Sequence, residues 1–553
     1  MLDIRCAGRN AFEKTINSPL YLFVKGCIIL SYLADGSDES GGNVMFAGLK
    51  SVGLFGLDSY MIKVEADVSA GLPAFNLVGL PDTAIRESRD RVHAAVKNSG
   101  FKFPTGRITV NLAPADRKKE GSVYDLPILI SILIASGQLK ADISDCIFLG
   151  EVSLDGRVRG VRGVLAMALT ARAENAKKLF VPAENAAEGA VAEGIEVYGV
   201  ESVSSLIKHL RGEELIPAAV PASDPGIPDA ARLDFSDVRG HIAAKKALET
   251  AAAGGHNILM IGPPGSGKSM LAMRLPTILP EMTFEESVET AKIHSIAGIL
   301  NGEHPLTSVR PFRAPHHTIS TPGLTGGGTV PRPGEISLAH NGVLFLDELP
   351  EFSRGAMEAL RQPIESGCVT VSRASGSATF PSNFMLVAAM NPCPCGYFGH
   401  PTRRCTCAPG AVSKYLGRIS GPMLDRIDLQ IEVGPVDYNA LSDARPSESS
   451  AEIKERVCRA REIQQKRYAG SGISCNARLT PAMLREFCVM TDDAAEYLKA
   501  SFDRLGLSAR AYDRILKVAR TSADLAGEEK IGKTHILTAI RFRSLDRKYW
   551  GVN

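Results

Sequence analysis

One stretch of the chain, residues 257–272, constrains the possible folds more than any other. The apolar run Ile258–Ile261 predicts a buried parallel strand, and residues 270–275 predict a helix. Between them stands the pattern Gly-x4-Gly-Lys-Ser, made up of Gly262, Pro263, Pro264, Gly265, Ser266, Gly267, Lys268 and Ser269. In such a loop the backbone N–H groups close around phosphates, the lysine contacts the β- and γ-phosphates, and the serine hydroxyl ligates Mg2+. A structural turn is the alternative, but the complete pattern indicates a site for ATP and Mg2+.

Two further apolar runs end in polar residues of the kind that nucleotide hydrolysis needs. Residues 343–346 predict a strand that is followed by Asp347 and Glu348, and residues 384–390 predict a strand that is followed by Asn391. Ligands bind at the carboxyl ends of strands in open parallel sheets. Asp347 would hold Mg2+ through water, Glu348 would act as general base, and Asn391 would orient the attacking water. The alternatives are an exposed acidic turn and an asparagine that only forms a turn before proline.

Composition limits the class of protein and its compartment. The 553 residues, 44% hydrophobic and 22% charged, are typical of a globular chain with about three domains. A net charge of +2 means that a polyanion would have to be bound by local basic patches. The longest apolar run, Leu20–Leu33, contains Lys25 and is short for a membrane span. The run also lacks a signal-peptide cleavage site, and the cysteines are unevenly placed, so we expect a cytoplasmic protein without membrane contact.

Shifts in composition divide the chain into five parts. Residues 1–44 lack periodicity and end in a polar Gly/Ser-rich stretch, and they are either an extension or a start-site artefact. The region 45–212 predicts an α/β domain with strands at 108–112, 147–152, 179–181 and 195–200, and with helices at 125–136 and from Val161. The proline-rich segment 213–232 predicts a linker. The ATPase core is expected at 233–435, with a first helix at 243–253. After Arg426 the chain is expected to be helical, and 436–553 predicts a lid with helices at 451–468, 481–489, 492–505, 509–526 and 533–542.

The α/β domain at 45–212 resembles the C-terminal domain of Lon proteases, which has a ribosomal S5 domain 2-like fold. The resemblance rests on residues 71–82 (GLPAFNLVGLPD), 119–127 (KEGSVYDLP) and 150–158 (GEVSLDGRV). Lon peptidases pair a serine nucleophile with a lysine base, and by this resemblance the two positions fall on Val123 and Met167. Ser122 is one residue away from the serine position, and a hydroxyl without a base is not an activated nucleophile. We therefore expect a Lon-like domain that is not a peptidase, with an active protease as a rival hypothesis.

The rest of the chain resembles AAA+ ATPases of the magnesium-chelatase-like ComM/YifB family. The strings that carry this resemblance are GGHN at 254–257, FRAPHH at 312–317, PGEISLAHNG at 333–342, LPEF at 349–352, LRQP at 360–363 and SGPMLDRID at 420–428. The resemblance implies an α/β fold with a P-loop parallel sheet and a helical lid. It also implies a homo-hexameric ring that acts on DNA as a branch-migration motor in natural transformation. Arg426 matches the arginine finger and Arg510 the sensor-2 arginine, both of which would neutralise charge on the γ-phosphoryl group.

Two insertions are candidates for contact with DNA. Residues 309–336 are rich in proline and glycine, carry too little apolar pattern for a core element, and contain the basic residues Arg310, Arg313, His316, His317 and Arg332. Residues 369–380 alternate and turn at 374–376, which predicts a hairpin that carries Arg373. In related rings hairpins at both places line the pore, where basic groups would bind phosphates without reading bases. Ordinary loops that brace the subunit remain the alternative.

Four cysteines lie close together after Asn391. They are Cys393, Cys395, Cys405 and Cys407, and the segment between them is turned by proline and glycine. Four thiols at this spacing can form a tetrahedral Zn2+ site, although Cys-x-Cys is tighter than the usual Cys-x2-Cys. Four reduced thiols in a loop are the alternative. The sequence as a whole predicts a Mg2+-dependent AAA+ motor on DNA, with a protein-remodelling ATPase that uses no DNA as the rival function.

Overall fold

The computed structural model describes residues 45–221, 233–300, 304–373, 376–435 and 447–550. The expected N-terminal extension with its apolar run Leu20–Leu33, most of the expected linker, and two residues of the hairpin turn at 374–376 lie outside the described residues. None of the helices in the described ranges is both long enough and apolar enough to cross a bilayer.

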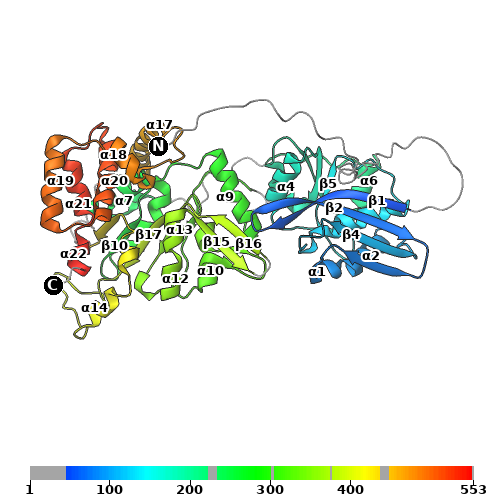
Figure 1. The fold of residues 1–553 in the computed structure, drawn as a ribbon, viewed down its shortest axis with the longest axis horizontal. Coiled ribbons are helices and arrows are strands. Elements are labelled where there is room, and N and C mark those ends of the chain that lie inside the picture. Colours follow the sequence, from blue (N-terminus) through cyan, green and yellow to red (C-terminus); the bar gives the residue numbers. More distant parts are fainter. Residues whose placement is uncertain (1–44, 222–232, 301–303, 374–375, 436–446, 551–553) are drawn as a thin grey trace, which may run out of the picture. The chain divides into compact units, whose positions relative to one another are not determined.

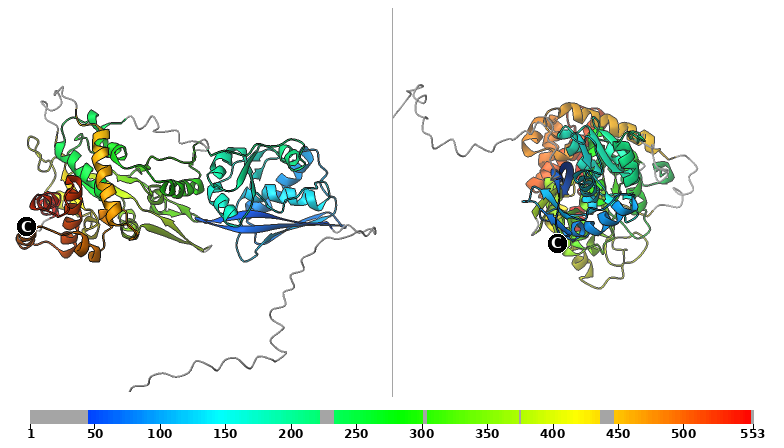
Figure 2. Two further views of the ribbon diagram at one scale, coloured as in Figure 1. Left: turned by 90° about the horizontal axis from the view of Figure 1, so that it is seen from above. Right: turned by 90° about the vertical axis from the view of Figure 1, so that its right-hand side faces the viewer.

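A seven-stranded mixed sheet forms the centre of the N-terminal domain, which is drawn in blue and cyan in Figure 1. Its strand order is β3-β4-β2-β1-β5-β8-β9, with β1 (Met45–Phe55), β2 (Asp58–Ser69), β3 (Ala74–Val78), β4 (Arg107–Ala113), β5 (Cys146–Phe148), β8 (Lys178–Pro182) and β9 (Glu196–Val200). The β1–β2 hairpin is long and antiparallel (Figure 2). Along β2 the buried residues Ile62, Val64 and Ala66 alternate with the less buried Lys63 and Glu65, so one face of the sheet carries the core.

Helices complete this domain. They are α1 (Thr83–Arg86), α2 (Ser88–Asn98), α3 (Asp125–Ala135), α4 (Val164–Ala173), α5 (Ala186–Ala190) and α6 (Val203–Leu210). Helix α3 has the sequence DLPILISILIA and is buried at all positions but Ile134, as expected for a helix that is apolar on every side. The expected single strand at 147–152 is wrong. The chain turns at Gly150 (φ +155°), where a Cβ atom would lie 2.8 Å from Val158, and continues as the short strand β6 (Glu151–Val152), paired with β7 (Val158–Arg159).

The ATPase module contains a second sheet of five parallel strands. Its order is β11-β14-β17-β10-β18, with β10 (Ile258–Ile261), β11 (Phe312–Arg313), β14 (Val343–Leu346), β17 (Met385–Met390) and β18 (Leu429–Glu432). All residues of β10, β14 and β17 are buried, because helices cover both faces of such a sheet. The three strands predicted from their apolar runs are confirmed, and each meets its neighbour in parallel register.

Two strands of this sheet contradict the sequence-based expectations. The insertion at 309–336 was expected to lack core elements, yet β11 lies within it and extends the sheet beside β14. The chain after Arg426 was expected to be helical, yet β18 follows it directly and pairs with β10. Strand β11 is too short to be predicted, since it has two residues, and β18, with the sequence Leu-Gln-Ile-Glu, lacks the uninterrupted apolar run that marked β10 and β14.

Helices surround the sheet and form the C-terminal lid, which is drawn in orange and red in Figure 1. Those of the core are α7 (Ile242–Gly254), α8 (Lys268–Arg274), α9 (Phe284–Ala297), α10 (Thr321–Thr325), α11 (Glu335–Leu338), α12 (Arg354–Ala359), α13 (Arg361–Ser366), α14 (Ala411–Leu416) and α15 (Gly421–Leu424). Those of the lid are α17 (Ser450–Arg467), α18 (Pro481–Phe487), α19 (Asp492–Leu505), α20 (Ala509–Ala526), α21 (Lys533–Arg541) and α22 (Leu545–Trp550). The five predicted lid helices are confirmed within about two residues. Lid and sheet share one hydrophobic core, in which Val457 and Ile515 join Ala251 and Ile258.

Two hairpins complete the module. Strand β12 (Gly326–Gly327) pairs with β13 (Arg332–Pro333), and β15 (Cys368–Arg373) pairs with β16 (Gly376–Pro381). The second hairpin confirms the one predicted at 369–380. The Arg373 guanidinium donates a hydrogen bond of 3.3 Å to the Gly328 carbonyl, so the two hairpins are tied together.

Candidate functional site

The phosphate-loop pattern lies at the carboxyl end of β10 and leads into α8. Gly265 and Gly267 have φ angles of +75° and +81°, conformations that glycine adopts without strain, and Gly267 precedes the first turn of α8. The Lys268 ammonium group is buried and donates to the carbonyls of Gly262 (2.8 Å) and Pro263 (2.9 Å). Burial lowers the pKa of Lys268, and the nearby Asp347 and Glu348 carboxylates partly oppose that shift. The loop therefore places a cation where a phosphate can replace backbone carbonyls as its partner.

The side chains of Ser269 and Asp347 meet as a magnesium site would require. The Ser269 hydroxyl donates to Asp347 Oδ2 at 2.7 Å, although the two residues are far apart in the sequence. A hydroxyl and a carboxylate are both groups that Mg2+ accepts in proteins, the first as a direct ligand and the second directly or through water. Serine and aspartate are thus the two residues that would hold Mg2+ here.

Glu348 lies next to this pair and has an unusual backbone. Its φ angle is +53°, a left-handed conformation that is uncommon for residues other than glycine. Its carboxylate is half-exposed and lies 3.2 Å from Nδ1 of His317. The sequence suggested His317 as a DNA contact, whereas the structure brings it to the proposed general base. No local signal could have shown this, because 31 residues separate the pair and the loop after β11 brings them together.

Asn391 follows β17 directly and reaches the phosphate loop. Its amide oxygen accepts a hydrogen bond of 3.2 Å from Lys268, and the preceding carbonyl of Met390 accepts one from the Gly262 N–H. The structure therefore gathers Lys268, Ser269, Asp347, Glu348 and Asn391 at one edge of the sheet. The carboxyl ends of the neighbouring strands β10, β14 and β17 meet there.

His241 is a residue of this region that sequence reasoning missed. A Cβ atom added at Gly267 would lie 3.4 Å from its Nε2 atom, so the imidazole stands against the phosphate loop. Nε2 is buried and has no hydrogen-bond partner among the described residues. Burial lowers the pKa of His241, which favours the neutral ring. The only sequence signal was its place just before α7, which has no diagnostic value.

Arg426 lies at the opposite edge of the sheet. Its carbonyl accepts a hydrogen bond of 3.0 Å from Asn257, the residue that precedes β10, whereas the phosphate loop follows β10. Five residues separate Asn257 from Gly262, or roughly 16 Å at about 3.3 Å per strand residue. The Arg426 side chain binds Glu365 at 2.7 Å and the Arg361 carbonyl at 3.1 Å. Arg426 is therefore not gathered with the nucleotide residues of its own chain.

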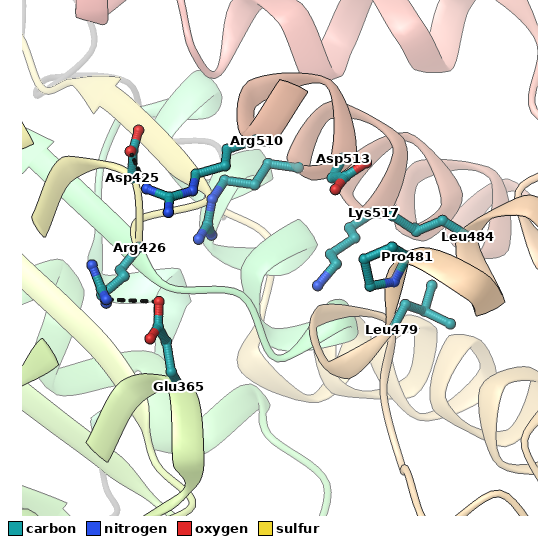
Figure 3. A pocket seen from close by; sticks show the side chains of 10 residues that line it. Glu365, Asp425, Arg426, Leu479, Pro481, Leu484, Arg510, Asp513 and Lys517 are labelled. Atoms are coloured by element: carbon teal, nitrogen blue, oxygen red, sulfur yellow. Dashed lines mark hydrogen bonds and ion pairs between the residues drawn. The ribbon is translucent and has the colours of Figure 1, made fainter. Parts of the chain in front are cut away.

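Arg510 lies beside Arg426 in a pocket between core and lid, shown in Figure 3. Its guanidinium is mostly exposed and lies 3.2 Å from the Asp425 carboxylate. The pocket, about 160 Å3, is smaller than the roughly 300–1,000 Å3 of a typical ligand site, and its lining includes no phosphate-loop residue. The two arginines expected to contact the γ-phosphoryl group thus share one surface, away from Lys268 of the same chain.

The four cysteines after Asn391 converge. The sulfur of Cys393 lies 3.3 Å from that of Cys395 and 3.8 Å from that of Cys405, and Cys395 and Cys405 are 3.5 Å apart. With Cys407 included, all four sulfurs lie within 4.8 Å of one another. Cys393 is buried, and the other three are partly exposed. The spacing in the sequence therefore corresponds to a compact thiol cluster in the fold.

Comparison with known proteins identifies the family. Three family models match: subunit ChlI of magnesium chelatase at residues 64–185 and 234–441, and the C-terminal part of ChlI at 447–543. The competence protein ComM of Haemophilus influenzae is 45% identical over 89% of this chain and 96% of its own length. YifB of Escherichia coli, described as uncharacterized, is 44% identical over 89% of this chain and 96% of its own. The chain belongs to the ComM/YifB family of magnesium-chelatase-like AAA+ ATPases.

A more distant relative matches a shorter stretch of the chain. The magnesium-chelatase 67 kDa subunit of Chlorobaculum parvum is 29% identical over 212 residues, which is 37% of this chain and 28% of that protein. The family membership accounts for the P-loop sheet and for its nucleotide residues. The likeness to this subunit covers too little of either chain to transfer a substrate.

The N-terminal domain buries the positions that a Lon peptidase would use. Val123 and Met167 are 8% and 1% exposed and belong to the domain's hydrophobic core. Ser122 donates a hydrogen bond to Glu151, and the buried Lys119 ammonium donates to the Pro114 carbonyl. The structure thus places apolar side chains at both aligned positions, and Lys119 is engaged with a backbone carbonyl.

Several basic residues of the first insertion have partners within the chain. Arg310 donates to the carbonyls of Pro280 and Asn341 and binds Glu286 at 2.8 Å. Arg313 forms two hydrogen bonds of 2.7 Å with Glu335. These two arginines therefore fit the alternative that the insertion is an ordinary loop that braces the subunit. His316 and Arg332 are exposed.

Proposed function

We propose that this chain is a Mg2+-dependent ATP hydrolase that works as a ring and moves on DNA, in recombination or natural transformation. The observation that carries the proposal is the separation of Arg426 from the phosphate loop of its own chain. The nucleotide site brings together a lysine, two magnesium ligands, a base and a polar orienting residue, and an arginine at the γ-phosphoryl group would complete it. A second copy that presents Arg426 and Arg510 would supply that arginine.

Each residue has a defined role in this proposal. Lys268 binds the β- and γ-phosphates, and Ser269 and Asp347 would hold Mg2+, which would neutralise part of the negative charge on the phosphates. Glu348 accepts a proton from the attacking water, and Asn391 orients that water. Arg426 of a neighbouring copy stabilises the charge on the γ-phosphoryl group, with Arg510 beside it. A homo-hexamer is the expected assembly.

The DNA substrate rests on family kinship and on the two hairpins. The Haemophilus influenzae relative is named a competence protein. The hairpins β12–β13 and β15–β16 carry Arg332 and Arg373, two basic groups that can bind phosphates on a pore wall.

A protein-remodelling ATPase is the second candidate. It is favoured by the ion pairs of Arg310 and Arg313, which leave fewer basic groups of the insertion for DNA. The decisive experiment measures ATP hydrolysis with single-stranded, duplex and branched DNA over a series of salt concentrations. A DNA motor is expected to be stimulated several-fold, with stimulation that fades as salt rises. A rate that ignores all three DNAs would favour the remodelling function.

The thiol cluster is proposed to bind zinc. With Zn–S bonds of about 2.3 Å, tetrahedral ligands lie about 3.8 Å apart, close to the observed distances of 3.3, 3.5 and 3.8 Å. Metal analysis of protein purified under reducing conditions is expected to give one zinc ion per chain. Stable protein without metal would contradict this part of the proposal.

A further inference from the structure

The loop that carries the four thiols connects β17 with α14 and touches the nucleotide site at two points. It begins at Asn391, whose amide oxygen accepts from Lys268 at 3.2 Å, and the first thiol, Cys393, follows two residues later. Cys393 is fully buried and its sulfur accepts a hydrogen bond of 3.3 Å from the Phe398 N–H. Only Pro392 lies between Asn391 and Cys393, so the position of the asparagine depends on the position of the thiol cluster.

The second point of contact is Gly396, which lies just after the second thiol, Cys395. Its φ angle is +84°, and a Cβ atom there would lie 2.4 Å from Cδ and 2.7 Å from Cγ of Pro264. Only glycine allows the turn of the cluster to pack this closely on the phosphate loop. Pro264 follows Gly262 and Pro263, whose carbonyls accept hydrogen bonds from Lys268, and it precedes the turn at Gly265. The cluster thus contacts the loop that would surround the phosphates.

A third contact joins the loop to helix α22. The ring of Phe398 lies 6.4 Å from that of Tyr549 in α22. The Tyr549 hydroxyl donates to Glu432 at 3.1 Å, and Glu432 ends β18 beside Ile261, the last residue before the phosphate loop. The loop therefore lies against structure that is itself joined to the end of β10.

Polar contacts within the loop hold part of it: Arg403 donates to the Tyr397 hydroxyl at 2.8 Å, and the Arg403 N–H donates to Nδ1 of His400 at 3.0 Å. Between Pro394 and Gly410, however, every side chain is partly or fully exposed. A segment that buries so little apolar surface offsets only part of the entropy of ordering its backbone. Four thiolate bonds to one ion would close it, and metal binding would then contribute directly to local folding.

We propose that the four-thiol centre, with zinc bound, positions the catalytic site by holding Asn391 and Pro264 in the geometry needed for ATP hydrolysis. This inference rests on the proposed ATP hydrolase and on the proposed zinc site. The cysteines are positioning residues, since none of them contacts a reacting atom. Loss of the metal would lower kcat more than it lowers affinity for ATP, because Ser269 is bonded to Asp347 and Lys268 keeps its two shorter bonds to carbonyls of the phosphate loop.

The test compares three variants of the full-length protein with a matched control. Cys405→Ser removes one ligand, and Cys405→His keeps a ligand that zinc accepts. Gly396→Ala keeps all four thiols but places a methyl group against Pro264. The control is Cys458→Ser, because Cys458 is a partly exposed cysteine of α17 that lies outside the cluster. Zinc content, the Kd of a fluorescent ATP analogue, and the basal rate of ATP hydrolysis without DNA are measured for each.

The expected results distinguish the positioning role of the thiol centre from the proposed zinc site and the proposed ATP hydrolase. Cys405→Ser should lose zinc and at least about tenfold in kcat while the Kd changes less than about threefold, and Cys405→His should regain both zinc and rate. Gly396→Ala should keep zinc and still lose rate, and Cys458→Ser should match the wild type. Zinc loss with an unchanged kcat would overturn the positioning role alone, and wild-type protein without zinc would overturn the site.

Hydrogen exchange supplies a readout that does not need turnover. Removal of the metal should raise amide exchange in peptides that cover residues 262–269 and 391–396, with no change in peptides of α3 in the N-terminal domain. Unchanged exchange at 262–269 after zinc loss would overturn the inference even if the wild type hydrolysed no ATP. Absence of ATP hydrolysis by wild type with normal zinc and this exchange pattern would instead count against the proposed function.

Discussion

The charged groups of the nucleotide site and those of the buried polar cluster in the N-terminal domain differ in how fully the protein itself pairs them. At the nucleotide site Lys268 is bound only to carbonyls and an amide, and Glu348 is half-exposed, so a ligand can replace their present partners. In the N-terminal domain the Asp125 carboxylate is fully buried, with Arg91 on both oxygens and the Val152 N–H on one. The first arrangement leaves groups ready for a substrate. The second satisfies the domain's own charges, as a structural framework does.

The largest expected effects test whether the first region is catalytic. Lys268→Ala should abolish ATP binding, because it removes the buried cation of the phosphate loop. Glu348→Gln should retain binding and slow hydrolysis by orders of magnitude, because an amide cannot accept the proton of water. Binding of a fluorescent ATP analogue and release of phosphate, measured on the same preparations, distinguish the two. Normal turnover by Glu348→Gln would show that the base lies elsewhere.

The next effect tests whether the nucleotide site is completed by a second copy. Arg426→Ala should bind ATP but hydrolyse it about 10^3-fold more slowly, the effect typical of arginine fingers. Mixing inactive Arg426→Ala with inactive Lys268→Ala should restore part of the activity, since some interfaces then pair an intact loop with an intact finger. The mixture is compared with each variant alone at equal total concentration. Inactive mixtures, despite demonstrated mixed oligomers, would contradict a role in trans.

Part of this site could be predicted from the sequence and part could not, for a physical reason. The strand, loop and helix around Lys268 are contiguous, and each of the Asp347 and Asn391 strands is an apolar run, so local pattern suffices. The separation of Arg426 from its own loop depends on β18 pairing with β10, and β18, with the sequence Leu-Gln-Ile-Glu, is not an apolar run. The approach of His317 to Glu348 likewise depends on a two-residue strand. Such short elements are stabilised by tertiary contacts rather than by local sequence.

The N-terminal domain is expected to lose stability when the negative charge of Asp125 is removed. Asp125→Ala would leave the partly buried Arg91 guanidinium without its carboxylate, and breaking a buried pair in this way costs about 3 kcal/mol. Limited proteolysis and hydrogen exchange of α3 would report the loss in the N-terminal domain. ATP affinity should stay unchanged. An unaltered exchange rate in α3 would contradict the structural importance of the pair.

A smaller effect on the rate of ATP hydrolysis is expected when the contact between His317 and Glu348 is removed. His317 holds the carboxylate at 3.2 Å, and a carboxylate engaged in this way is less available to accept a proton from water. His317→Ala is therefore expected to raise the DNA-independent rate of ATP hydrolysis several-fold without altering the Kd for ATP. His316→Ala, which removes a ring that bonds to Thr318 and packs 4.1 Å from that of His317, should change the rate less. A lower rate in His317→Ala would mean that the histidine assists Glu348 instead of restraining it.

The smallest effect is expected at Ser122, the hydroxyl nearest to the position of a Lon nucleophile. A serine becomes a nucleophile when an adjacent base accepts its proton, and Lon peptidases use a lysine for this. Here the aligned lysine position is Met167 in the core, and Lys119 is bound to the Pro114 carbonyl. Ser122→Ala should therefore leave ATP hydrolysis unchanged. Wild type and variant should both fail to cleave casein or a fluorogenic peptide, with or without ATP. Peptide cleavage that disappears in Ser122→Ala would show that Ser122 is a nucleophile and that the N-terminal domain is catalytic as well.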